Sequence, residues 1–500
     1  MKIKYLKIVS VLILVTTLST SCKKYLDVNR NPNVAEVVDP KLLFSTTTIQ
    51  YVNLRASGDL WVPMSLVSQA VASNGNTDGT VWGTPSEEQY DVNALSLGNT
   101  WRYLYASTSG GNLKEMIRLS ESAPVKNNNA AAQAKVLLSF MIYDATVIYG
   151  DVPFTEAWRA DVSYPKFDTQ QSVFDNLIKL LDEAYTQFDE ASPLKVSDYD
   201  LFYQGNIAKW KAVARSLKLR ILMTMVDKDP SKAAAIGQAL TAGGFISSPA
   251  GNFQVAYPGI AGRYNPKWGL YNLYNSGQSF FGASKWALNF MNPINDPRRA
   301  IYFEKPATAA NYVAPEPAQD IDPAVHSRIN RNFQHSGQPE VLFTYQEVLF
   351  YQAEAYARGL GVTTDLTMAT TLYKKAVEES VKHIASQSKD VAAAATATAA
   401  AASFAASLPA LSTFATNREA VKYIHYHHWI DKMDRGIDVF TQWRRSGPEG
   451  DEVPAITLPP GAPAGGLFRR YEYPITNEIS ANPNAPKDKI LYNVKMWFDL

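Results

Sequence analysis

The sequence of 500 residues contains a single cysteine, Cys22. With one thiol the chain cannot form an internal disulfide, and it offers no cysteine pair as metal ligands. Net charge is also nearly absent, because 48 Lys and Arg residues face 47 Asp and Glu residues. A neutral chain without a long basic run lacks the electrostatic footprint that binding to a nucleic-acid backbone requires. We therefore expect no nucleic acid among its partners.

Catalytic and cofactor motifs are missing as well. The patterns G-x-S-x-G, H-E-x-x-H and G-x-x-x-x-G-K do not occur, nor does a dinucleotide glycine fingerprint after a strand. The histidine cluster HYHHW has no acidic partner at metal-ligand spacing, and we interpret it as core or surface histidines on a helix: His425, His427 and His428. We expect no catalytic residue, no cofactor and no metal ligand.

The segment DVNRNPN, residues 27–33, alternates Asp and Asn as the start of a calcium loop does. It lacks the glycine at the sixth position and the glutamate at the twelfth, where Val38 stands. We interpret it as a turn-rich tether.

The N-terminus has the three parts of a secretory signal: a basic stretch MKIKYLK, an apolar stretch over 8–18, and small polar residues before Cys22. The apolar stretch is too short to cross a bilayer as a helix, which takes about 20 residues. A lone exported cysteine at this point indicates a bacterial lipoprotein signal, in which the sulfur of Cys22 carries diacylglycerol; the alternative is an incidental free thiol. We expect a signal peptide over 1–21, a tether over 22–39 and a helical domain over 40–500.

Apolar residues beyond the tether follow helical spacing, and no strand series is evident. We predict an all-α fold with four helix pairs: 41–72 with 100–119, 131–149 with 172–188, 206–226 with 231–242, and 345–358 with 366–383. Alanines in YQEVLFYQAEAYARGLG let two helices approach closely, as in a tetratricopeptide pair, although no regular repeat length is visible. The alanine-rich run 391–407 is predicted to be a helical spacer or mobile insertion.

Three stretches are predicted to be irregular: 73–99, 244–338 and 446–500. Two segments within them, 75–90 and 265–286, combine aromatic rings with amide and hydroxyl groups. Sugar rings stack on aromatic faces and need such polar partners, and peptides could use the same surface. The candidate ligand-binding residues are Asn76, Asp78, Trp82, Tyr90, Trp268, Tyr271, Tyr274 and Trp286. The alternative is that these aromatics anchor long loops to the helices.

Several motifs occur in one characteristic order: CKKYLDVNRNPN, YGDVPFTEAW, PKFDTQQSVFDNLIKLLDEA, WKAVARSLKLRILM, NDPR, FYQAEAYARG, WIDKMDRGIDVFTQWRRSG and RRYEYPITNEISANPNA. In these the sequence resembles the SusD/RagB family of Bacteroidetes outer-membrane lipoproteins, in its second, SusD-like branch. The resemblance implies a helical SusD-like fold built on four degenerate tetratricopeptide-like helix pairs, with long irregular ligand-binding loops.

The resemblance also implies a function. Proteins of this family are lipid-anchored in the outer membrane, facing the cell exterior, and capture a glycan or peptide for a TonB-dependent, SusC/RagA-like transporter. The tetratricopeptide side commonly contacts that transporter. The resemblance carries over no ligand residue. Two other functions stay open: a surface glycoside hydrolase using paired carboxylates, and a structural tetratricopeptide adaptor. We interpret Arg444, Arg445, Arg469 and Arg470 as structural arginines that hold the C-terminal segment on the helices.

Overall fold

Side-chain caps mark where the long helices of the computed structural model begin. Asn127, Thr169 and Asn206 each accept a hydrogen bond from a backbone amide in the first turn of the following helix. Thr344 and Asp365 cap the next pair in the same way. Capping satisfies amides that would otherwise lack a partner at a helix start. These are the helices that the apolar periodicity predicts most clearly.

The structure describes residues 39–73, 85–92, 97–106, 108–274, 279 and 281–500. The predicted positions Cys22, Asn76, Asp78 and Trp82 lie outside the described residues. Residues 40–500 form one compact unit.

Helices account for most of this unit. Its α-helices are α2 (Pro40–Arg55), α3 (Trp61–Val67), α4 (Pro85–Glu88), α5 (Gly98–Trp101), α6 (Thr108–Ser122), α7 (Asn128–Tyr149), α8 (Gln170–Gln187), α9 (Ile207–Met225), α10 (Lys232–Ala242), α11 (Pro266–Tyr274), α12 (Lys285–Met291), α13 (Arg299–Tyr302), α14 (Tyr345–Arg358), α15 (Leu366–Ser386), α16 (Val391–Ser407), α17 (Asn417–Asp431), α18 (Gly436–Arg444) and α19 (Asn477–Ala481). A π-helical turn, Arg102–Ala106, precedes α6, and short 3₁₀ turns span Ser197–Tyr199, Pro249–Gly251 and Leu411–Thr413.

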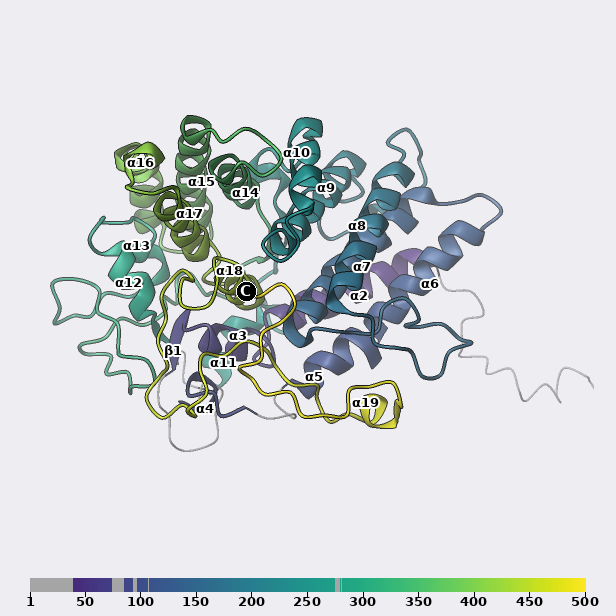
Figure 1. The fold of residues 1–500 in the computed structure, drawn as a ribbon, viewed down its shortest axis with the longest axis horizontal. Helices are drawn as coiled ribbons and strands as arrows, with labels where there is room; N and C mark the ends of the chain where they lie inside the picture. The colour runs from purple at the N-terminus through teal and green to yellow at the C-terminus, as the bar shows by residue number, and fades with distance from the viewer. Residues whose placement is uncertain (1–38, 74–84, 93–96, 107, 275–278, 280) are drawn as a thin grey trace, which may run out of the picture. The chain divides into compact units, whose positions relative to one another are not determined.

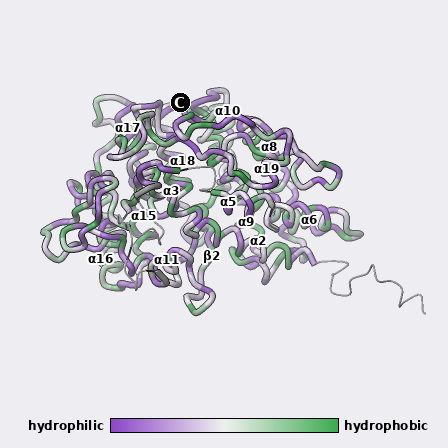
Figure 2. The backbone as a smooth tube through the Cα atoms, turned by 90° about the horizontal axis from the view of Figure 1, so that it is seen from below, coloured by the Kyte–Doolittle hydropathy of each residue, from purple (hydrophilic) through white to green (hydrophobic). Residues whose placement is uncertain are grey.

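The predicted helix pairs are present as packed neighbours. Helix α7 packs on α8, α9 on α10, and α14 on α15, and α8 also packs on α9, so the pairs form a continuous array. Figure 1 shows this array, with α14 to α17 on one side of the unit and α6 to α8 on the other. Hydrophobic positions recur along the helices throughout the unit (Figure 2).

The first predicted pair needs a correction. Residues 41–72 do not form one helix, because α2 ends at Arg55 and α3 begins at Trp61. The intervening Ser57-Gly58-Asp59 forms a turn, in which the Ser57 hydroxyl donates to the carbonyl of Leu54 over 2.7 Å. The partner stretch 100–119 is divided among the end of α5, the π-helical turn and α6. Helix α2 still packs on α6, so the pairing itself is correct.

The helical fold also contains a few short strands that the sequence does not reveal. Four short strands form two antiparallel two-stranded sheets in the described residues: β1 (Val71–Ser73) with β3 (Phe281–Ala283), and β2 (Phe253–Val255) with β4 (Glu340–Phe343). Strands of three or four residues leave almost no periodic signal, and each pairs with a segment far away in the sequence.

The alanine-rich run 391–407 is a docked helix, α16, and not a separate spacer. It packs on α15, and its buried side chains include Ala397, Ala401 and Phe404. Small side chains allow the two helices to approach closely.

Helix α7 is long and apolar enough to cross a membrane, but its apolar stretch is buried inside the protein. Burial on every face is typical of the central helix of a large helical domain.

Candidate functional site

The sheet of β1 and β3 brings the two predicted ligand segments together. In its register Val71 lies opposite Ala283, and Ser73 lies opposite Phe281. The segment that follows β1 and the segment that precedes β3 therefore leave the sheet from the same end. The first contains the stretch 75–90 and the second contains Trp268, Tyr271 and Tyr274, whereas Trp286 follows β3 and, like Gln69, lies at the other end of this three-residue sheet. Because paired antiparallel strands lie side by side, these two aromatic segments start next to each other in the fold.

Gln69, just before β1, forms hydrogen bonds with several segments of this region. Its side-chain oxygen accepts a hydrogen bond from the indole nitrogen of Trp286 over 2.6 Å. Its amide nitrogen donates to the carbonyl of Thr457 over 2.7 Å, and its own backbone carbonyl accepts from the hydroxyl of Ser284 over 2.7 Å. Gln69 has a φ of 52°, a left-handed conformation that is uncommon for a residue other than glycine. One buried side chain thus fixes the orientation of the Trp286 ring.

Tyr90 is a buried residue of the same region and contacts Gln69. Its side chain is 1% exposed and packs at a tilt against the rings of Phe468 and Tyr492. Its hydroxyl accepts a long hydrogen bond, 3.4 Å, from Gln69. Burial raises the pKa of Tyr90 to about 12, so the hydroxyl stays protonated at neutral pH. Gln69 therefore connects two of the predicted ligand residues, Tyr90 and Trp286.

Trp268 is on α11, and the neighbouring residue anchors that helix. The ammonium of Lys267 donates to Asp434 over 2.8 Å and lies 3.2 Å from Glu340. It also lies 5.9 Å from the centre of the Trp61 ring, which in turn packs edge-on against Phe281 in β3. The half-buried Trp268 ring packs edge-on against Tyr264. The side chains of Tyr271 and Tyr274, also on α11, lie outside the described residues.

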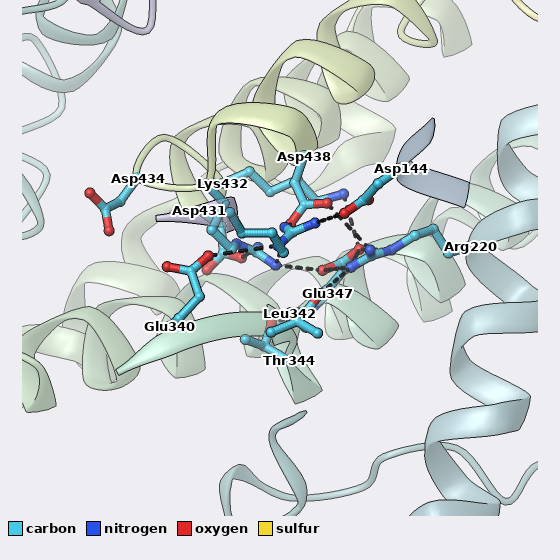
Figure 3. Close-up of polar contacts among 12 residues, drawn as sticks. Asp144, Arg220, Glu340, Leu342, Thr344, Glu347, Asp431, Lys432, Asp434 and Asp438 are labelled. Atoms are coloured by element: carbon cyan, nitrogen blue, oxygen red, sulfur yellow. Dashed lines mark hydrogen bonds and ion pairs between the residues drawn. The ribbon is translucent and has the colours of Figure 1, made fainter. Parts of the chain in front are cut away.

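A network of buried charged side chains includes Lys267 of α11 and Glu340 of β4. Figure 3 shows its side chains converging from α7, α9, β4, α14 and α18. Glu347 accepts two hydrogen bonds from the guanidinium of Arg220, at 2.8 and 2.9 Å. It also forms ion pairs with Lys432 at 3.0 Å and with Arg435 at 2.8 Å. The remaining members are Arg55, Asp144, Lys267, Glu340, Asp431, Asp434 and Asp438. We call this set the central ion network.

The pKa values within this region follow from burial and partner charges. Burial opposes ionisation of Glu347, but three neighbouring cations hold its pKa well below the ordinary range. Burial lowers the pKa of Lys432 to about 8, against the attraction of Glu347. Nearby, burial alone would raise the pKa of Glu354, whereas the guanidinium of Arg445 lowers it to about 2. These carboxylates stay ionised and paired at neutral pH, which makes the network a structural element.

The predicted histidine roles are confirmed, and the predicted arginine roles are confirmed in part. His425, His427 and His428 are buried on α17, and burial keeps the pKa of each below its ordinary value. Arg444 donates to the carbonyls of Val147 and Arg469, and Arg445 forms a two-pronged pair with Glu354 at 2.8 Å.

Arg469 pairs with Asp499, and Arg470 donates to the carbonyl of Tyr149. Arg444 and Arg470 thus bond the C-terminal segment to α7, whereas Arg445 joins α18 to α9 and α14, and the ion pairs of Arg469 lie within the segment. In the described part of the chain no group of three or more His, Cys, Asp or Glu side chains could hold a metal ion.

Three supporting residues of the region, Gln69, Ser284 and Lys267, were not among the predicted positions. Nothing in the local sequence marks Gln69 or Ser284, because each acts on a residue distant in the chain. Lys267 alone gave a signal, as a cation next to a tryptophan at the start of an aromatic segment.

With this geometry described, comparison with known proteins gives the family. A sequence-family model described as starch-binding and associating with the outer membrane matches residues 32–474. The chain belongs to this SusD-like family. Members of the family are binding proteins, and the chain is accordingly a binding protein rather than an enzyme. No curated protein matches the sequence.

Solved structures share the SusD-like fold over nearly the whole chain. A SusD-like protein of Bacteroidetes AC2a has a TM-score of 0.75 at 19% identity, covering 93% of this chain and 100% of its own. A SusD/RagB family protein from Bacteroides thetaiotaomicron has a TM-score of 0.74 at 18% identity, with 92% and 99% covered. A chitin-binding protein has a TM-score of 0.72 at 21% identity, with 92% and 100% covered. The all-α, SusD-like fold predicted from the sequence is confirmed.

Proposed function

We propose that this protein captures a glycan at the outer membrane and binds it at the region around Gln69, Trp268 and Trp286. The observation that carries the proposal is the β1–β3 sheet, which gives two aromatic, amide-rich segments a common origin. The hydrogen bond from Trp286 to Gln69 holds one ring in place, as stacking on a sugar requires. The family description, starch-binding, and the chitin-binding neighbour support a glycan over a peptide.

The remaining predicted residues complete the proposed site. Asn76, Asp78 and Trp82 follow β1 in the sequence, and Tyr271 and Tyr274 precede β3. Their rings, amides and carboxylate would contact the sugar, while Tyr90, which is buried, supports the wall behind Gln69.

The proposal includes an anchor and a partner. Cys22, after a signal peptide over 1–21, carries the lipid, and residues 22–39 form the tether that leads to the helical domain at 40–500. The domain faces the cell exterior and delivers its glycan to a TonB-dependent, SusC/RagA-like transporter. Mass spectrometry of the mature N-terminus tests the anchor: an S-diacylglyceryl Cys22 supports it, and an unmodified Cys22 contradicts it.

Glycan binding is tested by calorimetric titration of the mature chain, residues 22–500 without lipid, with maltoheptaose, chitohexaose and a mixture of short peptides. We expect saturable binding of a glycan without cleavage, and at least a tenfold loss of affinity in Trp268→Ala and Trp286→Ala. Trp497→Ala is the matched control, because that tryptophan is also half-buried but packs on Phe174 near the C-terminus. Binding of peptides alone, or equal losses in all three variants, would contradict the glycan site.

A further inference from the structure

A pocket of about 300 Å³ lies between the π-helical turn, the segment 153–167 and α19. Its walls are mainly aromatic and apolar, with Trp158, Tyr164, Phe167 and Ile479 among them. Exposed polar side chains, Ser163 and Glu478, stand at its edge. None of the residues proposed for the site at Gln69 lines it. Its volume is at the lower end of small-molecule sites, which span about 300–1,000 Å³.

Four aromatic rings form a continuous stack along this pocket. The Trp101 ring stacks on Tyr105 at 4.4 Å between centres, and Tyr105 stacks on Trp158 at 5.4 Å. On the other side of Trp101, Phe167 is stacked at 6.1 Å. The indole nitrogen of Trp158 donates to the carbonyl of Tyr105 over 2.9 Å, which fixes the outer ring of the stack.

The placement of Trp158 is conformationally costly. Its φ is 58°, in the left-handed region that bulky residues rarely adopt. Its ring lies against the first turn of α6, where a Cβ on Gly110 would come within 2.0 Å of the indole. A glycine weakens a helix, yet Gly110 is the residue that leaves room for the ring. Strain of this kind persists where the position of a side chain matters for function.

Two buried polar atoms in the lining residues are unsatisfied. The indole nitrogen of Trp101 and the hydroxyl of Tyr105 have no hydrogen-bond partner among the described residues. Both atoms can donate, and Tyr105 belongs to a π-helical turn, a distortion frequent at functional sites. A buried donor without a partner is unfavourable, and both atoms are shielded from solvent within residues that line the pocket.

We propose that the pocket beside Trp158 is a second binding site, and that it takes a neutral sugar residue. An aromatic wall fits the C–H face of a sugar ring, and the Ser163 and Glu478 side chains at the edge can meet its hydroxyl groups. Glu478 is the only charged side chain in the lining, which favours a neutral ligand over an ionic one. The choice of a sugar rests on the proposed function, whereas the pocket itself is independent of the region around Gln69.

The test is the binding stoichiometry of the mature chain, residues 22–500, titrated with maltoheptaose, chitohexaose and a polyproline decapeptide. We expect two sugar sites per chain in the wild type and one in Tyr164→Ala and Trp158→Ala. Tyr164 is 51% exposed, so its replacement leaves folding intact even if Trp158→Ala impairs it. Tyr199→Ala, at a tyrosine that is 41% exposed and far along the chain, is the matched control and should keep two sites.

The outcomes separate the two proposals. One sugar site in the wild type, unaffected by Tyr164→Ala, overturns the second site and leaves the proposed function intact. Binding of the decapeptide, lost in Tyr164→Ala while sugar binding is unchanged, overturns the sugar assignment in favour of a proline-rich peptide. Sugar binding that is lost only in Tyr164→Ala, with Trp286→Ala unchanged, supports the second site and overturns the site at Gln69. No sugar binding at all overturns both.

Discussion

The central ion network and the region around Gln69 differ in how their polar groups are used. In the network the charges are buried, apart from the partly exposed Asp434, and each is opposed by a partner, as Glu347 is by Arg220. The hydrogen bonds of Gln69 join neutral groups only, Trp268 and Trp286 are half-buried, and a single amide fixes the Trp286 ring. The first arrangement stabilises one packing of the helices. The second leaves aromatic surface available beside fixed polar atoms, which is what a ligand needs.

Removing the centre of the network should give the largest effect. In Glu347→Gln, Arg220, Lys432 and Arg435 lose the carboxylate that they share. Unpaired buried charges are costly, so we expect the free energy of unfolding to fall by about 3–5 kcal/mol in denaturant titration. Glu115→Gln, in an exposed pair with Arg118, is the control and should change little. A small loss in Glu347→Gln would remove the distinction between the two regions.

Acid should weaken the helical part through Glu354. Its pKa is about 2 in the folded chain against an ordinary value of 4.5. Between these values the unfolded chain binds a proton that the folded chain does not, so stability falls as the pH falls from about 4.5 to 2, by about 3 kcal/mol in total.

Asp499, in the neighbouring C-terminal segment, changes the stability in the opposite direction as the pH falls. Burial raises the pKa of Asp499 to about 6 from 3.8, so its folded form takes up the proton first and this contribution grows as the pH falls through 6. Denaturant titrations of the wild type and Glu354→Gln from pH 6 to pH 3 separate the two groups. The difference between the two proteins should shrink below pH 4.5, and a constant difference would refute the pairing with Arg445.

Gln69→Ala should affect binding more than stability. It removes the acceptor of the Trp286 indole and leaves that nitrogen without its partner. We expect glycan affinity to fall about tenfold in calorimetric titration, with the denaturation midpoint shifted less than in Glu347→Gln. A stability loss equal to that of Glu347→Gln, with affinity unchanged, would show that Gln69 serves packing alone.

The two regions also differ in how far the sequence predicts them. Helices α7, α8, α9, α14 and α15 follow from apolar spacing, which is a local signal, whereas the caps Thr169 and Asp365 were not predicted. The arginines at 444, 445, 469 and 470 were recognised as structural, but their partners Val147, Glu354 and Asp499 could not be, because those contacts join distant segments.

The candidate residues were proposed from the local composition, but the contacts that bring their segments together were not predicted. Trp268 and Trp286 stand out as rings among amides, but the pairing of β1 with β3 involves strands too short to carry a pattern. Gln69 is inconspicuous in the sequence, since its importance comes from a left-handed backbone and partners more than 200 residues away. The interruption of 41–72 at Ser57-Gly58-Asp59 was visible in the residues and was missed in favour of the longer periodic pattern.

The most direct test of the central claim is hydrogen exchange of the backbone amides, followed by mass spectrometry, with and without a saturating glycan. The account predicts new protection in peptides from 69–92 and 264–286, and unchanged exchange within helices α9, α14 and α15. New protection confined to those helices, with none in the two aromatic segments, would contradict it.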